Sequence, residues 1–239
     1  MMECDPYSLI EGMTIAAYSV GASYGYIYLR SEYPLAKYFL TQAIQNLKSK
    51  NLLGKNILGK NFTFDIELRI GAGSYVCGEE TAMMESIEGK RGLVRSKPPL
   101  PAIKGLFNKP TLINNVITLA SISAILLQGN EVFSQFGSGK SLGTMPYQLC
   151  GNIKQGGLIE VPFGITLNEM IYDFGAGTLS DKPVHAVQIG GPLGIYLPAH
   201  LFNTPLTVES LIDIKGTLGH GGVIVFDDST NMALQAKFA

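Results

Sequence analysis

An alternating segment followed by clustered glycines constrains the fold of this chain more than any other feature. Residues 62–70 alternate apolar and polar side chains, the period-two pattern of a β-strand with one polar face. The earlier segment 26–29 is aromatic and β-branched and also predicts a strand. Between them, Pro34 opens a segment of helical spacing that ends near Gly54. Strand, helix and strand of these lengths predict a parallel β-α-β unit.

The segment after the second predicted strand is the best candidate for a binding site. Gly71, Gly73 and Gly78 follow the strand, and a helical pattern resumes at Glu79. Glycine lets a backbone approach a ligand closely, and α/β sheets bind nucleotides where a strand ends beside a helix N-terminus. Clustered glycines also occur in ordinary tight turns, so both interpretations stay open. Glu79 and Glu80 lie about 100° apart on a helix, which does not predict an acid–base dyad, and one could simply favour the helix dipole.

A basic, proline-rich segment and a pair of asparagines come next. Four basic residues fall within eight positions, and three prolines follow closely: Lys90, Arg91, Arg95 and Lys97, then Pro98, Pro99 and Pro101. These cations could meet phosphates or could form a solvated surface loop. Asn114 and Asn115 precede an apolar helix that runs to about Gln128. Either asparagine could cap that helix or donate its side-chain amide to a ligand.

The second half of the chain predicts short strands and one helix. The strands are expected at 147–150, 157–161, 186–189 and 223–226, and the helix from Thr166 to about Phe174, with Thr166 as its cap.

Composition and cysteine usage argue against several classes of protein. The net charge of −1 argues against nucleic acid or an anionic membrane as the main partner. No run approaches the roughly 18 apolar residues of a membrane span, and the first residues do not resemble a signal peptide, so we expect a cytoplasmic protein without direct membrane insertion. Cys4, Cys77 and Cys150 are widely spaced and indicate reduced thiols, and neither they nor the histidines have metal-ligand spacing.

Taken together, these segments resemble the NADH-dehydrogenase 51-kDa flavoprotein family. The segments that match it in order and spacing are 71–82, 86–91, 97–102, 109–111 and 114–116. Upstream, 5–13 and 28–34 also match, so the resemblance covers nearly all of the chain. Within the family, 190–198 and 219–228 look most like the β subunit of NAD-dependent, molybdenum-containing formate dehydrogenases.

The resemblance implies both a fold and an activity. The implied fold is α/β: a Rossmann-like FMN- and NAD(H)-binding core with a parallel sheet, followed by a β-grasp, ubiquitin-like, soluble-ligand-binding domain. The implied activity is that of a diaphorase subunit, which transfers hydride between NAD(H) and FMN and passes electrons to iron–sulfur clusters. We expect an NAD-dependent formate dehydrogenase, or alternatively an NAD-linked hydrogenase or complex I. The implied partners are a 24-kDa-like [2Fe–2S] subunit and a catalytic molybdenum or hydrogenase subunit.

The resemblance also implies which residues form the site. The implied cofactor-binding residues are Gly71, Gly73, Tyr75, Gly78, Glu79, Glu80, Lys97, Leu100, Asn114 and Asn115. The dinucleotide side would be lined by Tyr75, Glu80, Lys97 and Leu100, and Glu80 would be the catalytic residue. An aromatic residue often stands at the position of Leu100, so stacking on adenine would be weaker here. Asn114 and Asn115 would contact FMN.

Two family features are expected to lie outside residues 1–239. These are an earlier glycine-rich loop with an acidic segment, and a later cysteine cluster for a [4Fe–4S] centre. We therefore expect a central fragment that is inactive and binds FMN weakly by itself, the cofactors being bound in the complete subunit. Residues 1–140 are expected to form a partial FMN/NAD(H) domain, 141–204 the β-grasp domain, and 205–239 the truncated start of the C-terminal iron–sulfur region. A non-catalytic structural or interaction role and a small-molecule site in the β-grasp part stay open.

Overall fold

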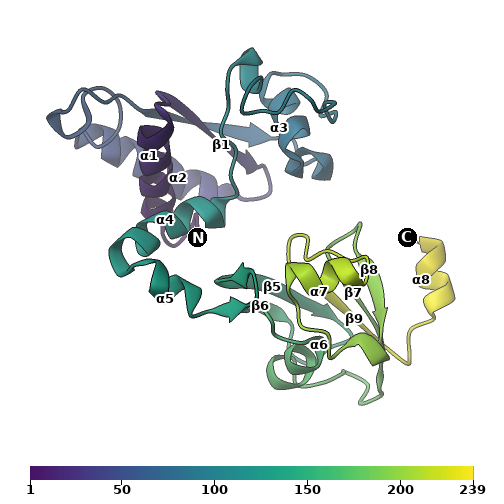
Figure 1. The fold of residues 1–239 in the computed structure, drawn as a ribbon. Coiled ribbons are helices and arrows are strands. Elements are labelled where there is room, and N and C mark those ends of the chain that lie inside the picture. The colour runs from purple at the N-terminus through teal and green to yellow at the C-terminus, as the bar shows by residue number, and fades with distance from the viewer. Residues whose placement is uncertain (239) are drawn as a thin grey trace. The chain divides into compact units, whose positions relative to one another are not determined.

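The computed structural model describes residues 1–238 and divides the chain after Leu127 into two compact units (Figure 1). Each unit has a hydrophobic core of its own. No helix within residues 1–238 combines the length and the apolar character that a bilayer crossing requires.

The first unit contains a two-stranded parallel sheet with helices packed on it. Its elements are α1 (Pro6–Val20), β1 (Tyr24–Arg30), α2 (Pro34–Ser49), β2 (Asp65–Gly71), α3 (Glu80–Ile87) and α4 (Val116–Gln128), with short 3-10 turns η1 (Ile57–Gly59), η2 (Tyr75–Gly78) and η3 (Leu106–Asn108). β1 and β2 pair in parallel from Tyr24 opposite Asp65 to Arg30 opposite Gly71. This confirms the predicted β-α-β unit.

One face of this sheet forms the core of the first unit. Ile27 and Leu29 of β1 and Ile66 of β2 are buried with residues of α1 and α2, such as Leu9 and Leu40. Each such side chain contributes about 1.5–3 kcal/mol by leaving water. The alternation in the sequence therefore selects the face that packs on the helices, and the other face carries Tyr24, Tyr26 and Tyr28, which are half-buried or exposed.

The second unit is a mixed sheet crossed by one helix. Its elements are α5 (Asn130–Ser134), β3 (Gly137–Ser138), β4 (Ser141–Leu142), β5 (Thr144–Gly151), β6 (Gly157–Pro162), α6 (Leu167–Glu169), η4 (Met170–Phe174), β7 (Val184–Ile189), β8 (Ile195–Pro198), η5 (Ala199–Leu201), α7 (Val208–Asp213), β9 (Gly222–Asp227) and α8 (Met232–Phe238). The strand order is β6-β5-β9-β7-β8, with β9 parallel to β5 and antiparallel to β7.

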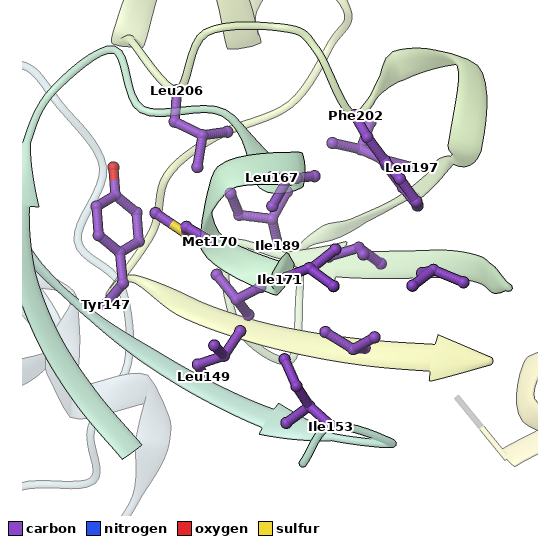
Figure 2. Packing of buried hydrophobic residues seen from close by; sticks show 14 of the residues in the cluster. Tyr147, Leu149, Ile153, Leu167, Met170, Ile171, Ile189, Leu197, Phe202 and Leu206 are labelled. Carbon is purple, nitrogen blue, oxygen red and sulfur yellow. The ribbon is translucent and has the colours of Figure 1, made fainter. Parts of the chain in front are cut away.

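The core of the second unit lies between α6 and the sheet. Figure 2 shows Leu167, Met170 and Ile171 packed over Leu149 and Ile189 of the strands. Thr166 caps α6, as the sequence predicted, and the structure shows that it does so in a capping box with Glu169. The strands predicted in this half are all present, β8 was not predicted, and the arrangement agrees with the β-grasp fold that the resemblance implied.

A strand from late in the chain completes this sheet. Val223 and Val225 of β9 are fully buried, and β9 lies between β5 and β7. The region predicted from residue 205 onward to begin a further domain therefore contributes, through β9, the central strand of the second unit.

Candidate functional site

The predicted glycine segment lies at the carboxyl ends of β1 and β2. Gly71 is the last residue of β2, and the backbone amide of Ser31, just after β1, donates to the Gly71 carbonyl oxygen at 3.2 Å. The chain then forms the η2 turn and enters α3 at Glu80. In parallel α/β sheets this edge is where ligands bind, so the segment from Gly71 to Glu80 occupies the expected position.

Local structure accounts for glycine at two of the three predicted positions, Gly71 and Gly73. A Cβ on Gly71 would lie 2.4 Å from the hydroxyl oxygen of Tyr28, so a larger residue there would have to displace the Tyr28 ring. Gly73 has a φ of 89°, which other residues rarely adopt. A Cβ on Gly78 would meet nothing within 4 Å, and its φ is not positive. Turn geometry and packing therefore explain Gly71 and Gly73, whereas Gly78 leaves open space beside the backbone.

Glu79 caps the start of α3 with its own carboxylate. Its Oε2 accepts hydrogen bonds from the backbone amides of Thr81 and Ala82, each at 2.8 Å. These are two of the amides that a helix start leaves without intrahelical partners. Because Glu79 already satisfies them, α3 does not offer these two amides to a phosphate. The structure therefore favours the prediction that one of the two glutamates, Glu79, stabilises the start of the helix.

Lys97 brings both glutamates into one charged cluster. Its ammonium forms an ion pair with the Glu80 carboxylate and lies 3.5 Å from Oε1 of Glu79. The hydrogen bond to Glu80, with the charges of both glutamates, holds the pKa of Lys97 above its ordinary value. Partial burial acts to raise the pKa of Glu79, but hydrogen bonds from Thr81 and Ala82 and the nearby ammonium outweigh it, so the pKa lies below its usual range. Lys97 and Glu79 thus both stay charged at neutral pH.

Two other cations of the proline-rich segment, Lys90 and Arg95, are held by two further glutamates. The Arg95 guanidinium contacts Glu85 at 2.5 Å and Glu88 at 2.8 Å and donates to the Gly105 carbonyl at 3.0 Å, while Lys90 pairs with Glu88 at 2.7 Å. Burial acts to raise the pKa of Glu88, but hydrogen bonds from Lys90, Arg95 and the Phe107 amide lower it to about 2. Arg95 therefore fastens the loop to α3, and Lys90 pairs locally just after that helix; neither interpretation of the sequence included these roles.

The remaining predicted residues do not take part in the ion pairs of Glu79, Glu80 and Lys97. Tyr75 in η2 and Leu100 in the loop are about half exposed. The side-chain oxygen of Asn115 accepts from the Ile117 amide at 2.9 Å at the start of α4, so Asn115 acts as a cap through its oxygen. Asn114 is exposed. Tertiary structure thus joins Glu79, Glu80 and Lys97 and leaves the asparagines at a separate helix start.

Sequence reasoning missed Thr81 and the ion-pair partners of Arg95. Thr81 is buried beside the cap, and the only sequence signal for it is a hydroxyl residue in the first turn of a predicted helix. Glu85 and Glu88 lie ten and seven positions before Arg95, a spacing that predicts no contact between helix and loop.

A hollow of about 240 Å³ lies between α3 and the proline-rich loop, lined in part by Thr81, Glu85, Glu88, Arg95 and Lys104. The acidic side chains that line it already pair with Arg95 and Lys90, so it is the space under the fastened loop. Within residues 1–238, no group of three or more His, Cys, Asp or Glu residues is placed to hold a metal ion.

Comparison with known proteins gives one family for this chain. The family model Complex1_51K, described as the Nuo51 FMN-binding domain, matches residues 1–124. The NADP-reducing hydrogenase subunit HndC of Solidesulfovibrio fructosivorans is 47% identical over 238 residues, which cover 100% of this chain and 49% of that protein. An NADH-quinone oxidoreductase subunit of Rhizobium meliloti (strain 1021) is 43% identical over 232 residues, which cover 97% of this chain and 55% of that protein. This chain therefore spans about half the length of these relatives.

A solved structure shows the same fold. The NAD+-reducing [NiFe]-hydrogenase in the air-oxidized state superposes with a TM-score of 0.81 at 34% identity, covering 96% of this chain and 37% of that one. The same enzyme in the H2-reduced state gives a TM-score of 0.79 at 35% identity, over 94% of this chain.

Proposed function

Since the chain belongs to the Nuo51 FMN-binding family, we propose that its first unit helps to bind FMN and NAD(H) for hydride transfer in a multi-subunit oxidoreductase. The observation that carries the proposal is the charged cluster of Glu79, Glu80 and Lys97 beside Gly78. It lies at the carboxyl ends of two parallel strands, the edge at which this class of sheet binds nucleotides.

The residues present fit the two cofactors. The open space at Gly78 admits close approach of a flat ring or a ribose to the backbone. Lys97 offers an ammonium donor, and the carboxylate of Glu80 accepts from hydroxyl groups, so the pair suits the sugar and phosphate part of a dinucleotide. Tyr75 and Leu100 offer exposed aromatic and apolar surface. Asn114 and Asn115 would supply amide donors toward FMN.

The proposed role of each residue follows from the chemistry of its side chain. When bound, FMN would exchange a hydride with NAD(H) and release electrons singly to iron–sulfur clusters, including a [4Fe–4S] centre in the complete subunit. Glu80 and Lys97 would orient the dinucleotide by charge and hydrogen bonding. Gly71 and Gly73 would shape the backbone at the strand end. Glu80 is the residue that we assign to the reacting region, in keeping with the family motif.

The enzyme that contains this unit is a finer proposal. The names of the relatives, a NADP-reducing hydrogenase subunit and an NADH-quinone oxidoreductase subunit, support a hydrogenase or quinone-linked complex. The motifs at 190–198 and 219–228 support the formate dehydrogenase interpretation. In each case the partners would be a 24-kDa-like [2Fe–2S] subunit and a catalytic molybdenum or hydrogenase subunit, in the cytoplasm. The domain boundaries after residues 140 and 204, which separate the FMN/NAD(H) domain, the β-grasp domain and the iron–sulfur region, stay predictions.

The test uses the full-length subunit that contains residues 1–239. The purified protein is titrated with FMN while quenching of flavin fluorescence is followed, and NADH-dependent reduction of ferricyanide is then measured. Saturable flavin binding with NADH-dependent turnover supports the proposal, and a protein that binds neither cofactor overturns it. Co-purified subunits assayed separately with formate, hydrogen and a quinone identify the complex.

A further inference from the structure

Thr81 joins α3 to the loop that carries Lys97. The residue is buried, with 2% of its surface exposed. Its hydroxyl donates to Oε2 of Glu79 at 2.5 Å and accepts from the backbone amide of Arg95 at 2.9 Å. A hydroxyl has one donor and two acceptor positions, so one side chain can make both bonds. Because Lys97 follows Arg95 by two residues, the bond from the Arg95 amide to the Thr81 hydroxyl fixes the backbone just before Lys97.

Arg95 fastens the same point a second time. Its guanidinium contacts Glu85 on α3, Glu88 just after that helix, and the Gly105 carbonyl further along the loop. The planar guanidinium presents several donors in a fixed geometry, so these contacts define both position and orientation. The Glu88 side chain is only 8% exposed, which limits screening of the pair by solvent. The loop is thus held by backbone and side chain immediately before Lys97.

We infer that Thr81 and Arg95 are positioning residues that hold the Lys97 ammonium against Glu79 and Glu80 for the dinucleotide. This inference rests on the proposed function. A lysine side chain is long and flexible, and more than a third of this one is exposed, so its placement depends on where the loop backbone is held. Valine at position 81 would keep the shape of threonine but would leave the Arg95 amide and Glu79 without the shared hydroxyl.

The contribution falls on binding more than on the chemical step. Lys97 would contact a part of the dinucleotide that carries charge and hydroxyl groups throughout the reaction. An interaction that is equal in ground and transition states changes KM and leaves kcat unchanged. Loosening the loop is therefore expected to weaken NADH binding without slowing turnover at saturation.

The experiment compares Thr81→Val with Thr81→Ser in the full-length, FMN-loaded subunit. Thr81→Val is expected to raise the KM for NADH about 3- to 10-fold, with kcat for ferricyanide reduction within about twofold of wild type. Thr81→Ser keeps the hydroxyl and should restore the wild-type KM. Arg95→Lys keeps the backbone bond but loses the multiple guanidinium contacts, so it should also raise the KM for NADH. It serves as the second test if Thr81→Val fails to fold.

Two further variants separate positioning from general loss of stability. Thr178→Val removes a comparably buried hydroxyl in the second unit, one that donates to the Lys182 carbonyl at 2.6 Å, and should leave KM unchanged. In a Lys97→Met background, Thr81→Val should add no further rise in KM, because its effect passes through Lys97. An unchanged KM in Thr81→Val, or a rise that persists without Lys97, would overturn the inference while the proposed function stands. A wild-type subunit that binds no NADH would overturn both.

Discussion

The ammonium of Lys97 forms an ion pair with the carboxylate of Glu80, which lies 17 positions earlier in the chain. Lys97 belongs to the proline-rich loop and Glu80 to the first turn of α3, so the pair connects two elements at the carboxyl end of the parallel sheet. More than a third of each side chain is exposed, and exposed pairs contribute little to stability. Its significance lies in placement, since both charges stay within reach of a ligand.

Replacing Glu80 by glutamine tests whether that placement serves the dinucleotide. The glutamine amide keeps the shape of the side chain but loses the negative charge that pairs with Lys97. Its oxygen is therefore a weaker acceptor for the hydroxyl groups of the dinucleotide. In the full-length enzyme, Glu80→Gln is expected to lower kcat/KM for NADH about tenfold or more. Steady-state kinetics measure this, with the exposed Glu131→Gln as the control for loss of one carboxylate. Unchanged kcat and KM would show that Glu80 has no part in the site.

Gly78→Ala tests whether open space at the strand end is used by a ligand. The new methyl group would meet nothing within 4 Å and φ is not positive, so the free energy of unfolding should change by less than about 1 kcal/mol. FMN or NADH affinity should nevertheless fall, because the methyl group would occupy the approach to the backbone. Gly73→Ala is the contrasting variant, expected to cost about 1–2 kcal/mol because its φ is 89°. Full affinity in Gly78→Ala would remove Gly78 from the site.

Glu88 makes the stability of the first unit dependent on acid pH. Its pKa is about 2 in the folded chain against an ordinary value of 4.5. The contribution is therefore fully present above about pH 4.5 and is lost as pH falls toward 2, and it amounts to on the order of 1–3 kcal/mol. Denaturant unfolding of wild type and Glu88→Gln at pH 7 and pH 3 measures it. The difference between the two proteins should be clearly smaller at pH 3 than at pH 7, whereas an equal difference at both would contradict the assignment.

Tyr147 in the second unit carries a buried hydroxyl that makes no hydrogen bond with the described residues. Burial raises the pKa of this phenol well above its ordinary value. Removing an unsatisfied buried hydroxyl is favourable, so Tyr147→Phe should leave stability unchanged or raise it by about 1–2 kcal/mol.

Tyr28→Phe gives the comparison for that measurement. The Tyr28 hydroxyl bonds to Oγ of Ser86 at 2.9 Å, so its removal should cost about 0.5–1.5 kcal/mol. Urea unfolding of both variants measures the difference. A loss of more than about 1 kcal/mol in Tyr147→Phe would mean that its hydroxyl has a partner.

Local patterns in the sequence determined the elements and their class. The alternation in residues 62–70, with a helical segment before it, was enough to predict the parallel pairing of β1 and β2. The threonine at position 166 predicted the start of α6. Strand alternation and helix capping are set by backbone geometry over a few positions, and a helix between two strands makes parallel pairing the expected arrangement. The motif order likewise indicated the family that the comparison confirmed.

Only the tertiary structure decided which distant groups meet. Lys97 pairs with Glu80, Thr81 bonds to the Arg95 amide, and β9 inserts between β5 and β7. The backbone of α4 also approaches α1 so closely that a Cβ on Gly12 would lie 1.8 Å from the Leu119 carbonyl oxygen. No spacing rule predicts such contacts, since they depend on how buried faces pack once the elements exist. The sequence therefore supplied the chemistry of the site, and packing around the sheet edge set its geometry.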